Sequence, residues 1–193
     1  VNLNKHTFQF GIRYDHRKVE TETFGTEGEE GFFPTVNRKF KSFNSAIGFK
    51  SKWSEQWLTR LNIATGFRAP NLSELTSNGV HEGSNRYEIG NINLKNEQNV
   101  QIDLNIDYTK DHFDFFINGF YNHINNYIFI QPTGDEIDGN VVFNYVQNNA
   151  VLFGGEAGIH LHPHPFDWLH ITSSYEMVVG QQRGEANLPL IPA

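Results

Sequence analysis

The chain has 193 residues, of which 38% are hydrophobic and 14% aromatic, with a net charge of −7 at pH 7 and a sequence pI near 5.7. The acidic balance argues against nucleic acid as a partner, because nucleic-acid binding requires a basic patch. There are no cysteines, which excludes disulfides, thiolate metal sites and cysteine nucleophiles. No run of about 18 apolar residues occurs, so a membrane-spanning helix is excluded, but a transmembrane β-barrel is not, because barrel strands carry their apolar residues in alternation.

Alternation of apolar and polar residues predicts a series of long strands. The first covers residues 6–15, with Phe8, Phe10, Ile12 and Tyr14 on one face. Further strands are expected at residues 43–51, 57–67, 100–108, 113–130 and 141–162, and from 169 onward. The fourth strand has the clearest pattern, and it predicts two faces, an apolar one with Val100, Ile102, Leu104 and Ile106 and a polar one with Gln101, Asp103, Asn105 and Asp107.

The connections between these strands alternate in length. Long connections are expected at residues 17–37, 69–97 and 131–140, and short turns at 52–56, 109–112 and 163–167. In an antiparallel meander, alternate connections lie at the same edge of the sheet, so the long ones gather at one end. Outer-membrane barrels have this asymmetry. We therefore expect an all-β fold, an antiparallel up-and-down meander of about seven long strands from a larger transmembrane β-barrel, with only consecutive strands paired and no parallel pair.

The alternative is a soluble β-sandwich that serves as a carbohydrate-binding module. In a sandwich the apolar row would pack against a second sheet, and Trp53, Trp57 or Trp168 would be the sugar-binding side chains. All three tryptophans instead lie beside the expected short turns, where barrels place a girdle of aromatic residues. Their position favours the barrel.

The longest connection, within residues 66–97, has no helical period and is rich in Asn, Ser, Gly and Glu. Connections longer than about 12–15 residues are uncommon and are usually functional or disordered. This one carries the candidate ligand-binding residues His81, Glu82, Arg86 and Tyr87, together with Glu88. We interpret it as a functional loop between two long strands.

Short motifs flank these candidates. Residues 67–70 read Phe-Arg-Ala-Pro, 73–75 read Ser-Glu-Leu, and 91–94 read Asn-Ile-Asn-Leu, followed by Lys95 and Glu97. In this order they resemble the F-R-A-P, S-E-L and N-P-N-L boxes of TonB-dependent outer-membrane receptors, with Ile92 in place of the usual Pro. Residues 119–128, 154–156 and 188–192 resemble later segments of the same barrels, so the resemblance covers nearly the whole chain.

The resemblance implies a 22-stranded barrel closed by an N-terminal plug domain. Residues 1–193 would then be one partial barrel domain, without the plug, the segment that contacts TonB and the closing strands. It further implies a receptor in the bacterial outer membrane that imports a scarce nutrient (a ferric siderophore, haem or zinc) with energy transmitted by TonB. The expected partners are TonB, the lipid bilayer and a small metal-containing ligand, with no permanently bound cofactor. We expect no enzymatic activity, since no Ser lies in a G-x-S-x-G motif.

Two groups of histidines are candidate metal ligands. The resemblance implies that a His between the F-R-A-P and N-P-N-L boxes, here His81, binds haem iron or zinc, and neutral imidazole suits both. A solvated loop side chain is the alternative for His81. His160, His162 and His164 have the alternate spacing that places strand side chains on one face. We interpret them as polar residues beside a turn, because the intervening prolines interrupt strand geometry.

Overall fold

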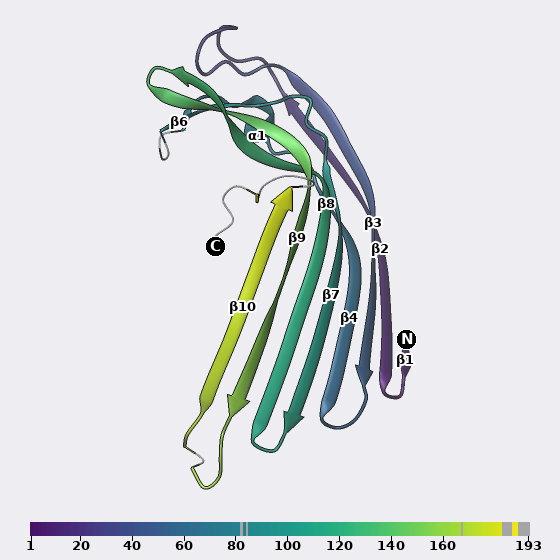
Figure 1. Ribbon diagram of the computed structural model, residues 1–193. Helices are drawn as coiled ribbons and strands as arrows, with labels where there is room; N and C mark the ends of the chain where they lie inside the picture. Colours follow the sequence, from purple (N-terminus) through teal and green to yellow (C-terminus); the bar gives the residue numbers. More distant parts are fainter. Residues whose placement is uncertain (82, 84, 167, 183–186, 189–193) are drawn as a thin grey trace.

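The computed structural model describes residues 1–193 except 82, 84, 167, 183–186 and 189–193, and its main feature is one curved sheet (Figure 1). The long strands are β2 (His6–Thr21), β3 (Val36–Lys52), β4 (Trp57–Arg68), β7 (Glu97–Lys110), β8 (Phe113–Ile137), β9 (Asn140–Leu161) and β10 (Ile171–Gln182). The short elements are β1 (Asn2–Leu3), α1 (Leu72–Thr76), β5 (Asn78–His81) and β6 (Arg86–Ile89). No helix of the described residues has the length and apolar character needed to cross a membrane.

The long strands form the expected meander. β2, β3, β4, β7, β8, β9 and β10 each pair with the next of these strands in antiparallel fashion. The register continues across the sheet, as the successive partners Phe49↔Leu61, Leu61↔Leu104 and Leu104↔Gly119 show. The prediction of an all-β antiparallel meander with about seven long strands is confirmed. The figure of 22 strands for the whole barrel stays a prediction.

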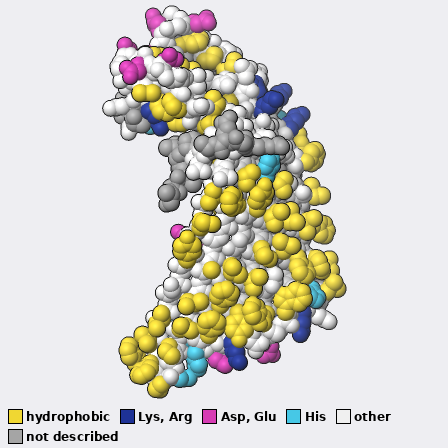
Figure 2. Space-filling view, in the orientation of Figure 1, with side chains coloured by type: hydrophobic (Ala, Val, Ile, Leu, Met, Phe, Trp, Pro, Cys, Tyr) yellow, Lys and Arg dark blue, Asp and Glu magenta, His cyan; other side chains and the backbone are white. Residues whose placement is uncertain are grey.

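One face of the sheet is apolar and exposed. Phe10 and Ile12 are 78% and 80% exposed, and Val100, Ile102 and Leu104 are also exposed. Figure 2 shows hydrophobic side chains over this face, between charged groups at its two ends. No second sheet of the described residues covers this row, so the fold is not the β-sandwich of the alternative interpretation.

The opposite face is polar and internally hydrogen-bonded. Arg60 Nη1 donates to Asp107 Oδ2 at 2.6 Å and to Asn105 Oδ1, and Asn105 Nδ2 donates to Asn118 Oδ1 at 2.6 Å. Gln101 Nε2 likewise donates to Asp103 Oδ1 at 2.7 Å. The predicted assignment of polar and apolar faces on β7 is confirmed, because each polar group has a partner on the face turned away from the apolar row.

The two ends of the sheet differ as expected (Figure 1). The turns β3–β4, β7–β8 and β9–β10 lie at one end, while the long connections gather at the other. At the short-turn end, the Trp57 and Tyr108 rings pack at 4.7 Å, and Trp53 and Trp168 are 59% and 75% exposed. Exposed aromatic rings at this level are typical of a membrane-interface girdle.

The strand ends at the long-connection end correct the sequence prediction. Of the loop expected at 17–37, only residues 22–35 connect β2 to β3. The loop expected at 131–140 is mostly strand, because β8 continues to Ile137 and a tight turn follows at Asp138 and Gly139, with φ of 49° and 78°. Beyond the apolar band both faces of a strand meet polar surroundings, so alternation no longer marks its extent.

The expectation that only consecutive antiparallel strands pair is wrong within the longest connection. It contains the helix α1 and the hairpin β5–β6, and β6 pairs in parallel with the outer end of β9, with Tyr87 opposite Val142. The hydrophobic core also lies here, where Val36, Leu75, Leu94 and Ile128 pack together. The connection is thus folded onto the sheet and shares its core.

Candidate functional site

The base of the longest connection is organised around Arg68, the last residue of β4. Its Nη1 donates to both carboxylate oxygens of Glu74, at 2.7 and 3.0 Å, and its Nε donates to Glu97 Oε2 at 2.8 Å, with a second bond from Nη2 to Glu97 Oε1. Glu74 and Glu97 are each only 8% exposed. The planar guanidinium suits this role, since it presents a fork of donors to carboxylates. One cation therefore neutralises two buried acids from opposite ends of the connection.

The same two acids hold backbone groups. Glu74 and Asn71 form a capping box at the start of α1: Asn71 Oδ1 accepts from the Glu74 backbone N–H at 2.8 Å, and Glu74 Oε2 accepts from the Asn71 N–H at 2.8 Å. Glu97 Oε1 accepts from the Ile128 N–H at 2.8 Å. A five-residue helix is marginal by itself, so we infer that this cap and the Arg68 contacts fix α1 in place.

The turn at residues 91–94 closes the base. Leu94 N–H donates to Asn91 O at 3.2 Å, and Asn91 Oδ1 accepts from Asn93 N–H at 2.9 Å. The turn packs against α1 through Asn91 N–H, which donates to Glu74 O at 2.9 Å. Gly90 is required by this approach, since a Cβ there would lie 2.5 Å from the Thr76 backbone nitrogen. The turn keeps its hydrogen bonds although Ile92 replaces the usual proline.

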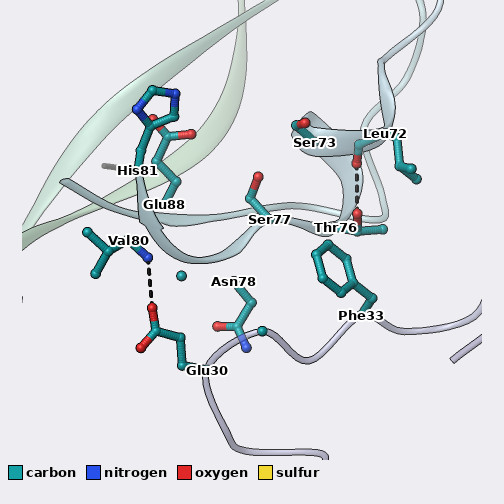
Figure 3. Close-up of a pocket in the computed structure, with 12 residues that line it drawn as sticks. Glu30, Phe33, Leu72, Ser73, Thr76, Ser77, Asn78, Val80, His81 and Glu88 are labelled. Atoms are coloured by element: carbon teal, nitrogen blue, oxygen red, sulfur yellow. Dashed lines mark hydrogen bonds between the residues drawn. The ribbon is translucent and has the colours of Figure 1, made fainter. Parts of the chain in front are cut away.

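The tip of the connection forms a different structure, an open cleft of about 390 Å³ (Figure 3). Its walls come from α1, from the hairpin β5–β6 and from the β2–β3 connection; among the lining residues are Glu30, Leu72, Ser77, Val80, His81 and Glu88. Figure 3 shows His81 and Glu88 at one side of the cleft and Leu72 and Phe33 at the other. Nitrogen and oxygen donors therefore face an apolar wall.

The structure brings one of the four predicted ligand-binding residues into the cleft lining. His81 lines the cleft at the end of β5. Arg86 Nη2 lies 3.1 Å from Glu88 Oε1, and its guanidinium lies over the Phe143 ring at 5.4 Å. Tyr87 is 5% exposed, and its hydroxyl donates to Asn78 Oδ1 at 3.0 Å. Glu82 lies outside the described residues.

Two carboxylates complete the lining. Glu88 is 6% exposed, and its Oε2 accepts from the Tyr145 hydroxyl at 2.8 Å. Burial and this hydrogen bond raise the pKa of Tyr145 above its usual range, so the phenol keeps its proton at neutral pH. Glu30 belongs to the β2–β3 connection, and its Oε1 accepts from the Val80 N–H of β5 at 3.0 Å. The sequence analysis missed Glu30, whose only signal was its membership of an acidic run.

Residues 1–192 match the family model described as TonB dependent receptor-like, beta-barrel. The chain belongs to this family. Among solved structures it is similar to the copper transporter OprC, with a TM-score of 0.79 and 18% identity over 99% of this chain and 29% of that one. It is also similar to the siderophore receptor PirA from Pseudomonas aeruginosa (TM-score 0.62, 19% identity, 91% and 35% coverage) and to the Serratia marcescens hemophore receptor HasR (0.61, 12%, 89% and 31%).

The family places the two ends of the sheet. TonB-dependent receptors are outer-membrane proteins, and outer-membrane barrels have longer loops outside the cell and short turns in the periplasm. In such barrels the apolar face lies against lipid and the polar face lines the lumen. The chain spans about a third or less of each of these three neighbours.

Proposed function

We propose that this chain forms wall strands and outer loops of an outer-membrane receptor that binds a metal-containing nutrient outside the cell and imports it with energy from TonB. The observation that carries the proposal is the cleft at the loop end, where His81, Glu88 and Glu30 face a common space. Binding residues concentrate on loops held by a rigid scaffold. TonB itself would act through parts of the receptor other than this chain.

The charge of the outer loops favours a cationic cargo. The β2–β3 connection, residues 22–35, contains four Glu, and the end of β8 with its following turn, residues 131–140, contains three acidic residues; neither segment has a Lys or Arg. Figure 2 shows acidic side chains at the tip of the loop end. A surface of one charge sign raises the local concentration of oppositely charged ligands and their rate of association. An anionic siderophore complex, or haem with its carboxylates, would meet repulsion here.

The donor set of the cleft agrees with that charge. Imidazole suits Zn²⁺ and Cu²⁺, and carboxylates complete many such sites. We infer that His81 provides nitrogen coordination and that Glu30 contributes negative charge, while the charge of Glu88 is balanced by Arg86. The proposed cargo is therefore a zinc or copper ion, or a weakly chelated form of one; haem and ferric siderophores are the alternatives that the experiment must separate.

The test uses the intact receptor in a Gram-negative strain deleted for its own metal receptors. Growth is measured with zinc, copper, haem or a ferric siderophore as the limiting nutrient, with and without TonB. We expect TonB-dependent growth on zinc or copper, and its loss in His81→Ala and Glu30→Gln. His16→Ala is the matched control, because His16 is an exposed His on β2 that does not line the cleft.

The outcomes separate the cargo from the class. Growth on haem or a siderophore with unchanged behaviour of His81→Ala would leave the receptor class intact and overturn the metal-ion cargo. Equal growth of all strains with and without TonB would contradict the receptor function itself.

A further inference from the structure

A second histidine cluster lies at the opposite end of the sheet from the cleft. The chain has nine His, and five of them come together where β8, β9 and β10 meet the short turns: His112, His160, His162, His164 and His170. Sequence alone suggested only the three of residues 160–164, as polar residues beside a turn. The β9–β10 register brings His170 to the cluster. Thr172 lies opposite His160 and Ile171 opposite Leu161, so the next residue toward the turn, His170, lies beside the end of β9.

Three of these imidazoles lie close enough together to hold a metal ion. One nitrogen from each of His160, His162 and His170 lies within 4.8 Å of the others. The closest pair is His160 Nε2 and His170 Nδ1, 3.1 Å apart. Nitrogens that bind one Zn²⁺ at about 2.0–2.1 Å each lie roughly 3–3.5 Å apart in tetrahedral geometry. This pair therefore already has the spacing of two ligands, and His162 offers a nitrogen within 4.8 Å of both.

Asp114 orients the first ligand. Its Oδ2 lies 3.2 Å from His160 Nδ1, so it accepts the proton on that nitrogen and leaves the lone pair of Nε2 directed toward His170. Without a metal, the His170 Nδ1–H donates to this lone pair. A metal ion would take both nitrogens, with His170 carrying its proton on Nε2 instead of Nδ1. Metal-bound His residues commonly donate their other N–H to a carboxylate in this way.

His162 supplies the observation that points to a missing ligand. Its Nδ1 is buried with no hydrogen-bond partner among the residues that the structure describes, as is Nδ1 of His112, whose ring packs 4.8 Å from the His162 ring. A buried polar atom without a partner destabilises the fold, and a ligand at this cluster would supply one. The backbone holds His162 in position, since its N–H donates to His112 O at 3.0 Å. His164 packs instead against His112, at 4.2 Å between rings.

We propose that His160, His162 and His170 bind a Zn²⁺ or Cu²⁺ ion at the short-turn end, with Asp114 as the residue that positions His160. The ion would join the end of β9 to the start of β10 and fasten the longest of the short turns to β8. This site is separate from the cleft in position and in residues. Its existence does not depend on what the receptor transports.

The experiment uses the intact receptor, purified in detergent without a polyhistidine tag and dialysed against EDTA. Zn²⁺ and Cu²⁺ are titrated separately, and the Cu²⁺ form is examined by electron paramagnetic resonance for coupling to imidazole nitrogen. We expect one tight equivalent with nitrogen coupling in the His81→Ala background, where the cleft is disabled. The triple variant His160→Ala/His162→Ala/His170→Ala should lose that equivalent.

Two further variants keep the test decisive. The control His6→Ala/His16→Ala/His123→Ala removes three His outside the cluster and should retain the tight equivalent. Asp114→Asn should keep the ligands but weaken binding about 10- to 100-fold, because it removes only the orienting carboxylate. If the triple variant does not fold, as judged by heat-modifiable migration, Asp114→Asn with the single variant His162→Gln decides the question. Binding that is equal in the cluster and control variants, or unaffected by Asp114→Asn and His162→Gln, would overturn the proposal.

Discussion

The base and the tip of the longest connection are built in opposite ways. At the base, ion pairs join Arg68 to Glu74 and Glu97, and each carboxylate also accepts a hydrogen bond from a backbone N–H group. At the tip, His81 and Glu88 line an open cleft. The motifs that resemble the family signature all lie at the base, while the candidate ligand-binding residues lie between the motifs.

This difference indicates what the signature does in this chain. Its Arg, both acids and the turn at residues 91–94 hold α1 and the two ends of the connection against the barrel wall. Such a base is compatible with different sequences at the tip, because it fixes the two ends of the connection and makes no contact that depends on the binding residues between them. The comparison predicts that changes at the base alter loop stability, and that changes at the tip alter binding.

The largest effect is expected for Arg68→Ala at the base. Removing one partner of a fully buried ion pair costs about 3–5 kcal/mol. The Arg68 side chain is 41% exposed and the side chains of Glu74 and Glu97 are each 10% exposed. After allowance for solvent screening, we therefore expect the local stability of the connection to fall by about 2–3 kcal/mol. Hydrogen exchange of the amides of residues 71–97 in the intact receptor measures this local stability.

Two variants sharpen that result. Arg68→Lys keeps the charge but not the fork of donors, so it should lose an intermediate amount. Arg13→Ala removes a 67% exposed Arg from its pair with Asp15 on β2 and should change the exchange of residues 71–97 little. Equal exchange in Arg68→Ala and Arg13→Ala would show that the signature Arg does not hold the loop.

The next effect concerns the glycine at which the turn meets α1. Gly90→Ala would place a Cβ 2.5–2.7 Å from backbone atoms of Leu75, Thr76 and Ser77, which cannot move like a side chain end. We expect the base to lose about 1–2 kcal/mol, as in other overpacked sites. Gly83→Ala at the tip is the control, because its Cβ would meet the His81 ring at an ordinary 3.6 Å. Similar exchange protection in the two variants would contradict the close approach.

A smaller effect is expected where the tip joins the wall. Tyr145→Phe removes the hydroxyl that donates to Glu88 Oε2 at 2.8 Å and should cost about 1 kcal/mol of protection in β5–β6. Because the pKa of Tyr145 is raised on folding, its contribution is complete below the unfolded value of about 10 and is lost as pH rises through the higher folded value. The contribution of the Tyr145 hydroxyl to the protection of β5–β6, corrected for intrinsic exchange, should therefore stay constant between pH 6 and 9. A decline in that range that disappears in Tyr145→Phe would refute the assignment.

The smallest effect is a stabilising one at residue 92. Ile92 occupies the second position of the turn in which Leu94 N–H donates to Asn91 O. Proline is favoured at that position, since its ring fixes φ near the value that the turn requires. Ile92→Pro should raise the stability of the base by about 0.4–1 kcal/mol, chiefly by restricting the unfolded chain. Lower thermal stability of this variant would show that the turn needs the Ile92 side chain or its N–H.

The wall of the sheet could be predicted from sequence because alternation reports directly on a strand with one apolar face. Val100, Ile102 and Leu104 therefore indicated the faces of β7 correctly. The outer end of β9 was predicted within a residue, but the extension of β8 from residue 131 to Ile137 was not, because its side chains are exposed on both faces and its residues read as a turn. The helix α1 was missed because five residues are too few to show a period, although Asn71 and Glu74 have the spacing of a capping box.

Contacts between distant segments were beyond the reach of the sequence pattern. The parallel pairing of β6 with β9 and the arrival of Glu30 beside Val80 both join segments about 50 residues apart in sequence. Periodicity describes only neighbours along the chain, so it carries no signal for either contact. His170 lies only 10 residues from His160, but the register of β9 with β10 that brings the two together is not visible in the alternation of either strand.

The most direct test of the division between base and tip is hydrogen exchange of the intact receptor with and without added Zn²⁺ or Cu²⁺, in the unmodified protein, His81→Ala and Arg68→Lys. We predict that one of these ions slows exchange in residues 78–89 of the unmodified protein, and that His81→Ala abolishes this effect without changing the base. Arg68→Lys should speed exchange in residues 71–76 and 91–97 whether or not metal is present. Protection by metal that persists in His81→Ala, or that is absent from residues 78–89 with both ions, would contradict the account.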